Sequence, residues 1–476
     1  MGLASGDHGV KRIVTTRCVA SAQRFVELPS FAYGMQLDKS KTCVSKDGNI
    51  MMMGLPRTVQ SFEEIVAYVE TSVLKRHELA ALVVVHIDEP LLVPCTKQET
   101  QQRRDSATKR VRPCANKPYQ VTDDPALPKD DSYTYETLVA LDNCAPLITL
   151  RPTRYRAFDA IFHEVFVRIC ARYERGEFPG CGVVFDGVDE RGASRPAGET
   201  REPRTLASSR ALTCAAALTD CSDGRGAVGE ADLKMRVAST RLARMPVDSP
   251  TRPTTILLDT VDTDLLPIML LEELPLDPTE PPDAMKHPAD VYICMRERGD
   301  YAKRELAHEL RSALGDAAEL NTDAGWLVVD VAQLRADILS FVHRPSKGDT
   351  VPTQRTILRT VVTAWAVAGC DFVDPVGNSG DALTEAAVTA IERRQDLHAC
   401  LANLQHDDER ALEAIPAMRE IIYTAALYCA GRGKSPQRLR EVSEVTIRRA
   451  IWSMLYWANP GNHPTTYELF GFPRPS

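Results

Sequence analysis

The sequence predicts an α/β protein in which helices flank a central, mostly parallel sheet. Short apolar runs end in an aspartate, as in residues 80–88 and 255–259. Continuous apolar runs of this kind are typical of strands buried on both faces, as in parallel sheets. An amphipathic helical segment leads into the first of these runs, which is half of a crossover unit. After Thr384 the pattern is mostly helical, which predicts a helical C-terminal region.

The first helix and strand are expected between residues 60 and 88. Ser61 and Glu64 form a capping box, which predicts a helix start. Apolar residues then recur at helical spacing, which predicts that one face of the helix is buried. These residues are Phe62, Ile65, Val66, Val69, Val73 and Leu74. The run from Ala80 to Asp88 follows as a buried strand, in which His86 is expected to be a core histidine.

Further elements follow in order along the chain. Residues 158–173 have helical periodicity and lead into a strand at 182–185, which ends at Asp186. More strands are expected at 255–258, 291–294 and 326–329, and Asp330 is the expected cap of a helix through Leu339. Long helices follow near 408–430 and 437–457, and Trp452, Tyr456 and Trp457 are expected in their core.

Two stretches interrupt this pattern and suggest insertions. Residues 89–155 begin with a basic helical segment, and residues 187–229 are rich in Gly, Ala, Ser, Thr and Arg without periodicity. The second composition is typical of a flexible insertion. We therefore expect a core in residues 1–380 that carries both insertions, followed by a helical region in residues 381–476.

Composition limits the class of protein. None of the 13 cysteines forms a C-x-x-C pair, which favours reduced thiols in the nucleus or cytoplasm. No apolar run approaches the length of a membrane span, so no membrane partner is expected. The formal net charge of −8 requires that any nucleic-acid-binding basic residues be clustered.

Acidic residues occur where an α/β sheet places its chemistry, at or just beyond the carboxyl ends of strands. They are Asp88, Glu230 with Asp232, Asp262 with Asp264, and Asp371, with Asp38 as a weaker candidate. Converging carboxylates repel one another unless cations relieve the charge. Mg²⁺ prefers such hard oxygen ligands, and two metal ions about 4 Å apart promote phosphodiester hydrolysis. The acids therefore predict a site for two Mg²⁺ ions, for which Mn²⁺ can substitute.

This order of motifs resembles the flap endonucleases and XPG-like structure-specific 5′ nucleases, a branch of the PIN-like fold. Residues 369–372, Gly-Cys-Asp-Phe, match the family's G-x-D-[YF] element, and residues 262–264 match its D-x-D element. The resemblance implies a PIN-like domain that cleaves 5′-flap or branched DNA with two metal ions. It implies metal ligation by Asp38, Asp88, Glu230, Asp232, Asp262, Asp264 and Asp371. Asp186 is a rival to Asp88 as the acid of the second strand.

In that family a basic segment follows the second strand and contacts the scissile phosphate. Residues 89–155 likewise follow the expected strand at 80–88 in the sequence, and the resemblance implies the same contact for them. Lys97 and Arg104 are seven residues apart and share a helix face, so they are the candidates for neutralising transition-state charge. Arg103, Lys109 and Arg110 are candidate nucleic-acid contacts. The alternative for the whole segment is a solvated basic helix.

Two other functions fit the same residues. Residues 229–234 contain Gly-Glu-Ala-Asp-Leu-Lys, which resembles an element of 5′-to-3′ exoribonucleases and of host-shutoff RNases of the same fold. A catalytically inactive PIN-like structural or assembly protein is the other alternative, and the acidic pI of about 5.8 favours it. The family's helix-hairpin-helix is not evident in residues 376–380, so the preference for flap DNA depends on the acidic motifs.

Overall fold

The structure is a computed structural model, which describes the placement of part of the chain's residues. These are residues 22–25, 28, 35–48, 51, 61–87, 151–177, 182–187, 203–206, 209–219, 231–260, 262, 264–271, 289–296, 326–342, 353–370, 373, 380–430 and 442–459.

A single eight-stranded sheet forms the centre of the protein, in the order β1-β8-β7-β6-β2-β3-β4-β5. The bounds are β1 Ala22–Phe25, β2 Thr42–Asp47, β3 Leu82–His86, β4 Gly182–Asp186, β5 Arg204–Thr205, β6 Thr255–Thr260, β7 Asp290–Arg296 and β8 Trp326–Asp330. Strands β7, β6, β2, β3 and β4 are parallel, whereas β8 and β5 pair antiparallel with them and β1 pairs antiparallel with β8. The prediction of a mostly parallel α/β sheet is confirmed.

The parallel strands wind outward from the middle of the sheet in two directions. From β2 the chain proceeds to β3 and β4 on one side, whereas β6 and β7 lie on the other side of β2. Strands β2 and β6 are neighbours, and Lys46 is paired with Asp259 in their register. The reversal of strand order between β2 and β6 is a topological switch point, where open α/β sheets bind their ligands beyond the carboxyl ends of the strands.

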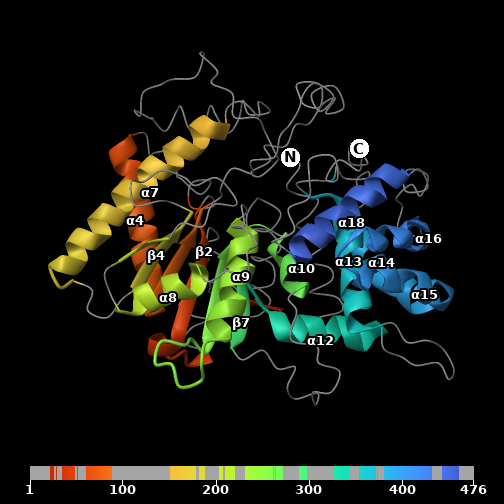
Figure 1. Cartoon of the computed structure of the whole chain (residues 1–476), viewed down its shortest axis with the longest axis horizontal. Helices are drawn as coiled ribbons and strands as arrows, with labels where there is room; N and C mark the ends of the chain where they lie inside the picture. The colour runs from red at the N-terminus through yellow and green to blue at the C-terminus, as the bar shows by residue number, and fades with distance from the viewer. Residues whose placement is uncertain are drawn as a thin grey trace, which may run out of the picture.

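Helices cover both faces of the parallel strands. On one face, α4 (Phe62–His77) packs against α7 (Arg151–Glu174), whose Phe162 and Phe166 contact the ring of Phe185 in β4. Figure 1 shows these two helices together at the left, away from the C-terminal helices. The capping box of Ser61 and Glu64 is confirmed, with hydrogen bonds in both directions.

The opposite face is covered by α8 (Ser209–Thr219) and α9 (Ala231–Ala243), which pack against each other. A side chain at Gly182 of β4 would meet the backbone of Ala211 in α8. Gly182 and Phe185 are three residues apart, so their side-chain positions point to opposite faces of the sheet. This places α8 and α9 across the sheet from α7.

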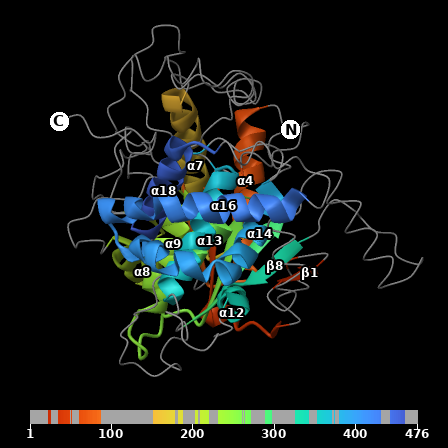
Figure 2. The same ribbon diagram turned by 90° about the vertical axis from the view of Figure 1, so that its right-hand side faces the viewer.

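The C-terminal part is helical, as expected, and it shares its hydrophobic core with the sheet. Its main helices are α10 Leu265–Leu270, α12 Val331–Val342, α13 Gln354–Ala368, α14 Gly380–Arg393, α16 Ile415–Ala430 and α18 Glu444–Ala458. Shorter ones are η6 Gln395–Leu397, α15 His398–Leu401, η7 Ala402–Gln405 and η8 Glu409–Ala414, while η3 Lys39–Lys41 precedes β2. Figure 2 shows α13 behind α14 and α16. The expected core positions Trp452, Tyr456 and Trp457 are buried.

The structure corrects two expectations from the sequence. Strand β2 was not predicted, although all six of its residues are buried at the centre of the sheet. The predicted flexible insertion at 187–229 is wrong for the residues of β5 and α8. Helix α8 forms because its small residues Ala211, Cys214 and Ala215, with Leu218, are buried against β4 and α9. Their small size hides the helical periodicity in the sequence.

Among the described helices, none combines the length and the apolarity needed to cross a membrane. The basic segment at 89–155 lies outside the described residues up to residue 150.

Candidate functional site at the carboxyl edge of the sheet

The carboxyl ends of three adjacent strands bring polar side chains together. Asp47 ends β2, His86 ends β3 and Asp186 ends β4, and the three are direct neighbours in register. Register partners in adjacent parallel strands point to the same face, and Asp186 shares the face of Gly182. These side chains therefore lie on the side of the sheet that α8 and α9 cover. The nitrogen Nδ1 of His86 is 3.2 Å from Oδ2 of Asp186.

Helix α9 contributes Asp232 and Lys234 at the same edge. Asp232 lies in the first turn of α9, which packs against β2 and β3. The ammonium of Lys234 is buried and donates a hydrogen bond of 2.7 Å to the carbonyl of Ile87, the residue after β3. Since Asp232 precedes this lysine by two residues, the first turn of α9 is held close to the ends of β3 and β4.

A glycine follows each of the two strand-ending acids, and both glycines are required by close packing. Gly187 has a φ of +113°, and a Cβ there would lie 2.5 Å from the carbonyl oxygen of Ile87. A Cβ at Gly48 would lie 3.0 Å from the carbonyl oxygen of His86. Gly187 therefore lets the chain take a left-handed conformation at the end of β4, and Gly48 leaves room beside the His86 carbonyl at the end of β2.

The loop after β6 supplies Asp262 and Asp264 and is braced by its own side chains. The Asp262 amide donates to Thr260 Oγ1 at 2.9 Å, and the Asp264 amide donates to Asp262 Oδ1 at 3.0 Å. Asp264 is also the N-cap residue of α10, and its Oδ1 accepts a 3.1 Å hydrogen bond from Trp365 Nε1. The loop thus presents two carboxylates next to the switch point between β2 and β6.

Helix α13 links this loop to the segment that contains Asp371. Trp365 belongs to α13, which ends at Ala368, directly before the Gly-Cys-Asp-Phe motif of residues 369–372. The hydrogen bond from Trp365 to Asp264, the N-cap residue of α10, therefore ties the end of α13 to α10. Just beyond α13, the backbone amides and carbonyls of Cys370 and Val373 bond to each other at 3.0 and 3.3 Å.

Asp38 is separated from the other predicted ligands. It caps η3 at the amino end of β2, where its Oδ1 accepts hydrogen bonds from the amide and hydroxyl of Ser40 at 2.9 and 2.6 Å. The six residues of β2 extend roughly 20 Å, at about 3.3 Å per residue, between that end and the carboxyl edge. Asp47, which the sequence analysis missed, occupies the position at the carboxyl end of this strand. The Asp47-Gly48 pair was the signal that could have revealed it.

Several predicted site residues lie outside the described part of the chain. They are Asp88, Lys97, Arg103, Arg104, Lys109, Arg110, Glu230 and Asp371. Their assignments as metal ligands or nucleic-acid contacts remain predictions. Asp88 follows β3 after one further residue, and Glu230 directly precedes α9.

The donors at the edge are hard carboxylate oxygens, which suit Mg²⁺. The described acids at the edge are Asp47, Asp186, Asp232, Asp262 and Asp264. Within the ranges that the structure describes, no three His, Cys, Asp or Glu side chains form a group that could hold a metal ion. In the described arrangement, these five acids therefore do not by themselves form a metal-binding group.

Asp259 also lies near this edge, but it belongs to a buried ion cluster on the opposite face. Its Oδ2 is 2.8 Å from Lys46 Nζ and 2.5 Å from Arg76 Nε. Burial alone raises the pKa of Asp259, but attraction from Arg76 and Lys46 outweighs this and lowers it. The ionised carboxylate is thus neutralised internally, so Asp259 is a structural acid rather than a metal ligand.

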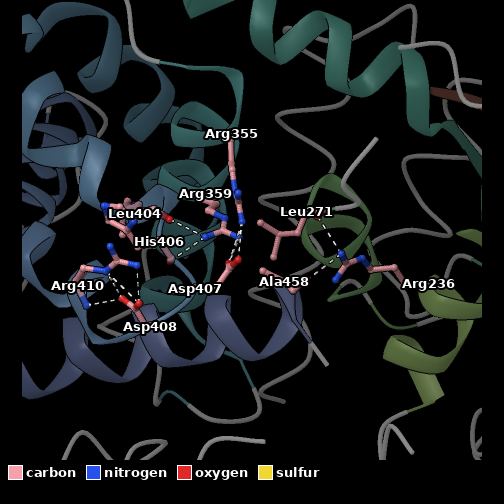
Figure 3. Close-up of polar contacts among 10 residues, drawn as sticks. All are labelled: Arg236, Leu271, Arg355, Arg359, Leu404, His406, Asp407, Asp408, Arg410 and Ala458. Carbon is pink, nitrogen blue, oxygen red and sulfur yellow. Dashed lines mark hydrogen bonds and ion pairs between the residues drawn. The ribbon is translucent and has the colours of Figure 1, made fainter. Parts of the chain in front are cut away.

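Arg236 fixes the elements that carry the acids. It lies one helical turn after Asp232 and donates to the carbonyls of Trp457, Leu271 (3.0 Å) and Ala458 (3.2 Å). Figure 3 shows its guanidinium between Leu271 and Ala458. Because Leu271 is the C-cap residue of α10 and Ala458 is the last residue of α18, one buried side chain caps two helices and joins them to α9.

No protein-family model matches the chain, and no curated protein sequence matches it either.

Proposed function

We propose that this protein is a metal-dependent nuclease whose site is the carboxyl edge of the sheet at the switch point between β2 and β6. One observation carries the proposal: acids from separate segments flank this point, Asp47 at the end of β2 and the Asp262–Asp264 loop after β6. Open α/β sheets bind their ligands at such points. Asp186 and Asp232 extend the acidic edge on the side of β3 and β4.

The proposed ligands are Asp47, Asp186, Asp232, Asp262 and Asp264, together with Asp88, Glu230 and Asp371 from the sequence. Bound Mg²⁺ supplies an activated water and stabilises the leaving oxygen of a phosphodiester. Among the proposed ligands, Asp264 is held in place by its amide hydrogen bond to Asp262 and by the hydrogen bond that its carboxylate accepts from Trp365. Carboxylates brought close together repel one another, so a purely structural protein gains nothing from directing several acids to one edge, which argues against the inactive alternative.

The order of the motifs supports 5′-flap or branched DNA as the substrate. The same proposal includes a PIN-like fold for the nuclease domain. The E-x-D, D-x-D and G-x-D-[YF] motifs follow one another along the sequence in an order that resembles that family. The position of Lys234 at the edge favours the exoribonuclease alternative, because this lysine belongs to the element that resembles those enzymes. RNA therefore belongs among the substrates to be tested.

The decisive experiment uses the full chain with labelled 5′-flap DNA, single-stranded DNA and single-stranded RNA, with Mg²⁺ or with EDTA. We expect Mg²⁺-dependent cleavage of flap DNA that the double variant Asp262→Ala, Asp264→Ala abolishes. Asp38→Ala is the matched control, since Asp38 lies at the opposite end of β2. It should cleave like the wild type. Failure of the folded, Mg²⁺-supplied wild type to cleave any substrate would reject the proposal.

A further inference from the structure

Three side chains form a hydrogen-bonded line across the carboxyl ends of β2, β3 and β4. The hydroxyl of Ser45 lies 2.9 Å from Nε2 of His86, and Nδ1 of the same ring lies 3.2 Å from Oδ2 of Asp186. Ser45 and His86 are completely buried, whereas the Asp186 side chain is 14% exposed at the edge. The line therefore runs from the interior of the sheet to the proposed metal site.

The same three residue types form the nucleophile, base and acid of serine hydrolases, but here burial excludes that chemistry. A nucleophilic hydroxyl must reach a substrate carbonyl. Ser45 has no exposed surface, and it lies between the neighbouring strands β6 and β3. The only member of the line at the surface is the carboxylate, so the line acts on Asp186 rather than on a substrate bound at Ser45.

The chemistry of the partners fixes the protonation of the ring. An ionised carboxylate only accepts hydrogen bonds, so Nδ1 carries the proton and donates a hydrogen bond to Asp186. Nε2 is then an acceptor, and the Ser45 hydroxyl donates to it.

We infer that His86 is a positioning residue for Asp186: it orients this carboxylate toward the metal site, and Ser45 holds the ring in the Nδ1-protonated tautomer. The inference rests on the proposed function, because it assigns Asp186 to the metal ligands. Outer hydrogen-bond partners of ligating side chains typically contribute 10–100-fold to metal affinity or activity. His86 occupies this role from the centre of the sheet, where its position is fixed by backbone pairing.

Two variants of His86 separate positioning from packing. In His86→Asn the amide nitrogen replaces Nδ1 and keeps the donor to Asp186, whereas in His86→Gln it replaces Nε2 and keeps only the Ser45 contact. Both variants remove the same ring, so their unfolding free energies serve as the control for packing. We expect Mn²⁺ affinity, measured by titration calorimetry, to fall about 10–100-fold in His86→Gln and less than about threefold in His86→Asn. The Mg²⁺ concentration for half-maximal cleavage should shift in parallel.

A measurement on the wild type does not depend on the variants folding. In ¹⁵N-histidine-labelled protein we expect the buried ring to be protonated at Nδ1, with its signal assigned by its absence from His86→Asn or, if that variant is unfolded, by its perturbation in Ser45→Ala. Protonation at Nε2 would overturn the inference. Equal Mn²⁺ affinity in wild type and His86→Gln would also overturn it while leaving the nuclease intact. Absence of Mn²⁺ binding by the wild type would overturn both proposals.

Discussion

The indole nitrogen of Trp365 lies 3.1 Å from a carboxylate oxygen of Asp264, although 101 residues separate them in the sequence. The contact joins the loop after β6 to α13, the helix that leads into the Asp371 motif. The Asp264 side chain makes no cap hydrogen bond to its own helix, and it is contacted by the indole, while the Asp264 amide donates to Asp262. This hydrogen bond therefore joins the D-x-D motif of residues 262–264 to the helix that directly precedes the motif of residues 369–372.

Replacing Trp365 by Phe should uncouple these motifs. The variant keeps an aromatic ring in the core but removes the donor to Asp264, so we expect cleavage to fall about 10-fold, at the lower end of the effect of outer hydrogen-bond partners. Trp452→Phe on α18 is the matched control, because the two tryptophans are 8% and 6% exposed. It should lose a similar amount of stability in urea unfolding and keep its activity. Equal activity losses in the two variants would refute the specific role of the indole.

The ion cluster of Asp259, Lys46 and Arg76 should be a stability determinant rather than part of the site. Asp259→Asn leaves two cations with side chains only 6% and 14% exposed, and breaking such a buried pair typically costs about 3–5 kcal/mol. Glu63→Gln is the control, because the Glu63 side chain that pairs with Arg168 is 72% exposed and such pairs contribute little. Urea unfolding at neutral pH measures both, and equal losses would contradict the prediction.

The same cluster predicts a pH dependence. The pKa of Asp259 lies below its usual value of 3.8 in the folded protein, so the unfolded chain binds the proton first as the pH falls. Its contribution to stability is fully present above that usual value and is lost as the pH falls through the folded pKa. The difference in unfolding free energy between wild type and Asp259→Asn should therefore shrink below about pH 4. A difference that stays constant down to pH 2 would show that the charge is not responsible.

Hydrophobic patterns located most of the sheet but missed its central strand. Strands β3, β4, β6, β7 and β8 are apolar runs, and the sequence identified each of them. Strand β2 contains Ser45, Lys46 and Asp47, which have the polarity of a loop. Their polar groups are satisfied by partners far away in sequence, Ser45 by His86 and Lys46 by Asp259. Burial that depends on pairing with distant residues has no local signature in the sequence. Asp47 was therefore missed as a candidate metal ligand, and Asp38 was named instead.

The acids after β6 and on α9 were found because each follows or precedes a clear element. An aspartate at the end of an apolar run indicates the carboxyl end of a strand, but the sequence alone does not determine which strands are adjacent in the sheet. The order β4-β3-β2-β6 depends on crossovers through α4, α7, α8 and α9. Only this order brings Asp47 and Asp186 to either side of His86.

Arg236 should hold the acid-bearing helices together. It donates to three carbonyls at the ends of α10 and α18. Arg236→Lys cannot reach all three with one ammonium group, so it leaves at least one buried acceptor unsatisfied, at a cost of about 1–3 kcal/mol. Arg241→Lys is the control on the same helix, since Arg241 donates to the carbonyl of Leu218 and is partly exposed, whereas Arg236 is buried. Thermal unfolding should show a larger loss for Arg236→Lys, and the opposite order would contradict this role.

Two adjacent aspartates in the C-terminal region should differ sharply in importance. Asp407 pairs with Arg359, whose side chain is 2% exposed, and with Arg355, at 2.5 and 2.8 Å, whereas Asp408 pairs with the exposed Arg410 (Figure 3). Asp407→Asn leaves the buried guanidinium with the carbonyls of Leu404 and His406. The expected loss is about 1–2 kcal/mol, at the lower end for a charged hydrogen bond because Asp407 is itself 43% exposed. Asp408→Asn keeps a residue suited to cap η8 and should change stability negligibly. Urea unfolding of the two variants tests the contrast, and equal effects would show that Arg359 does not depend on its ion pair.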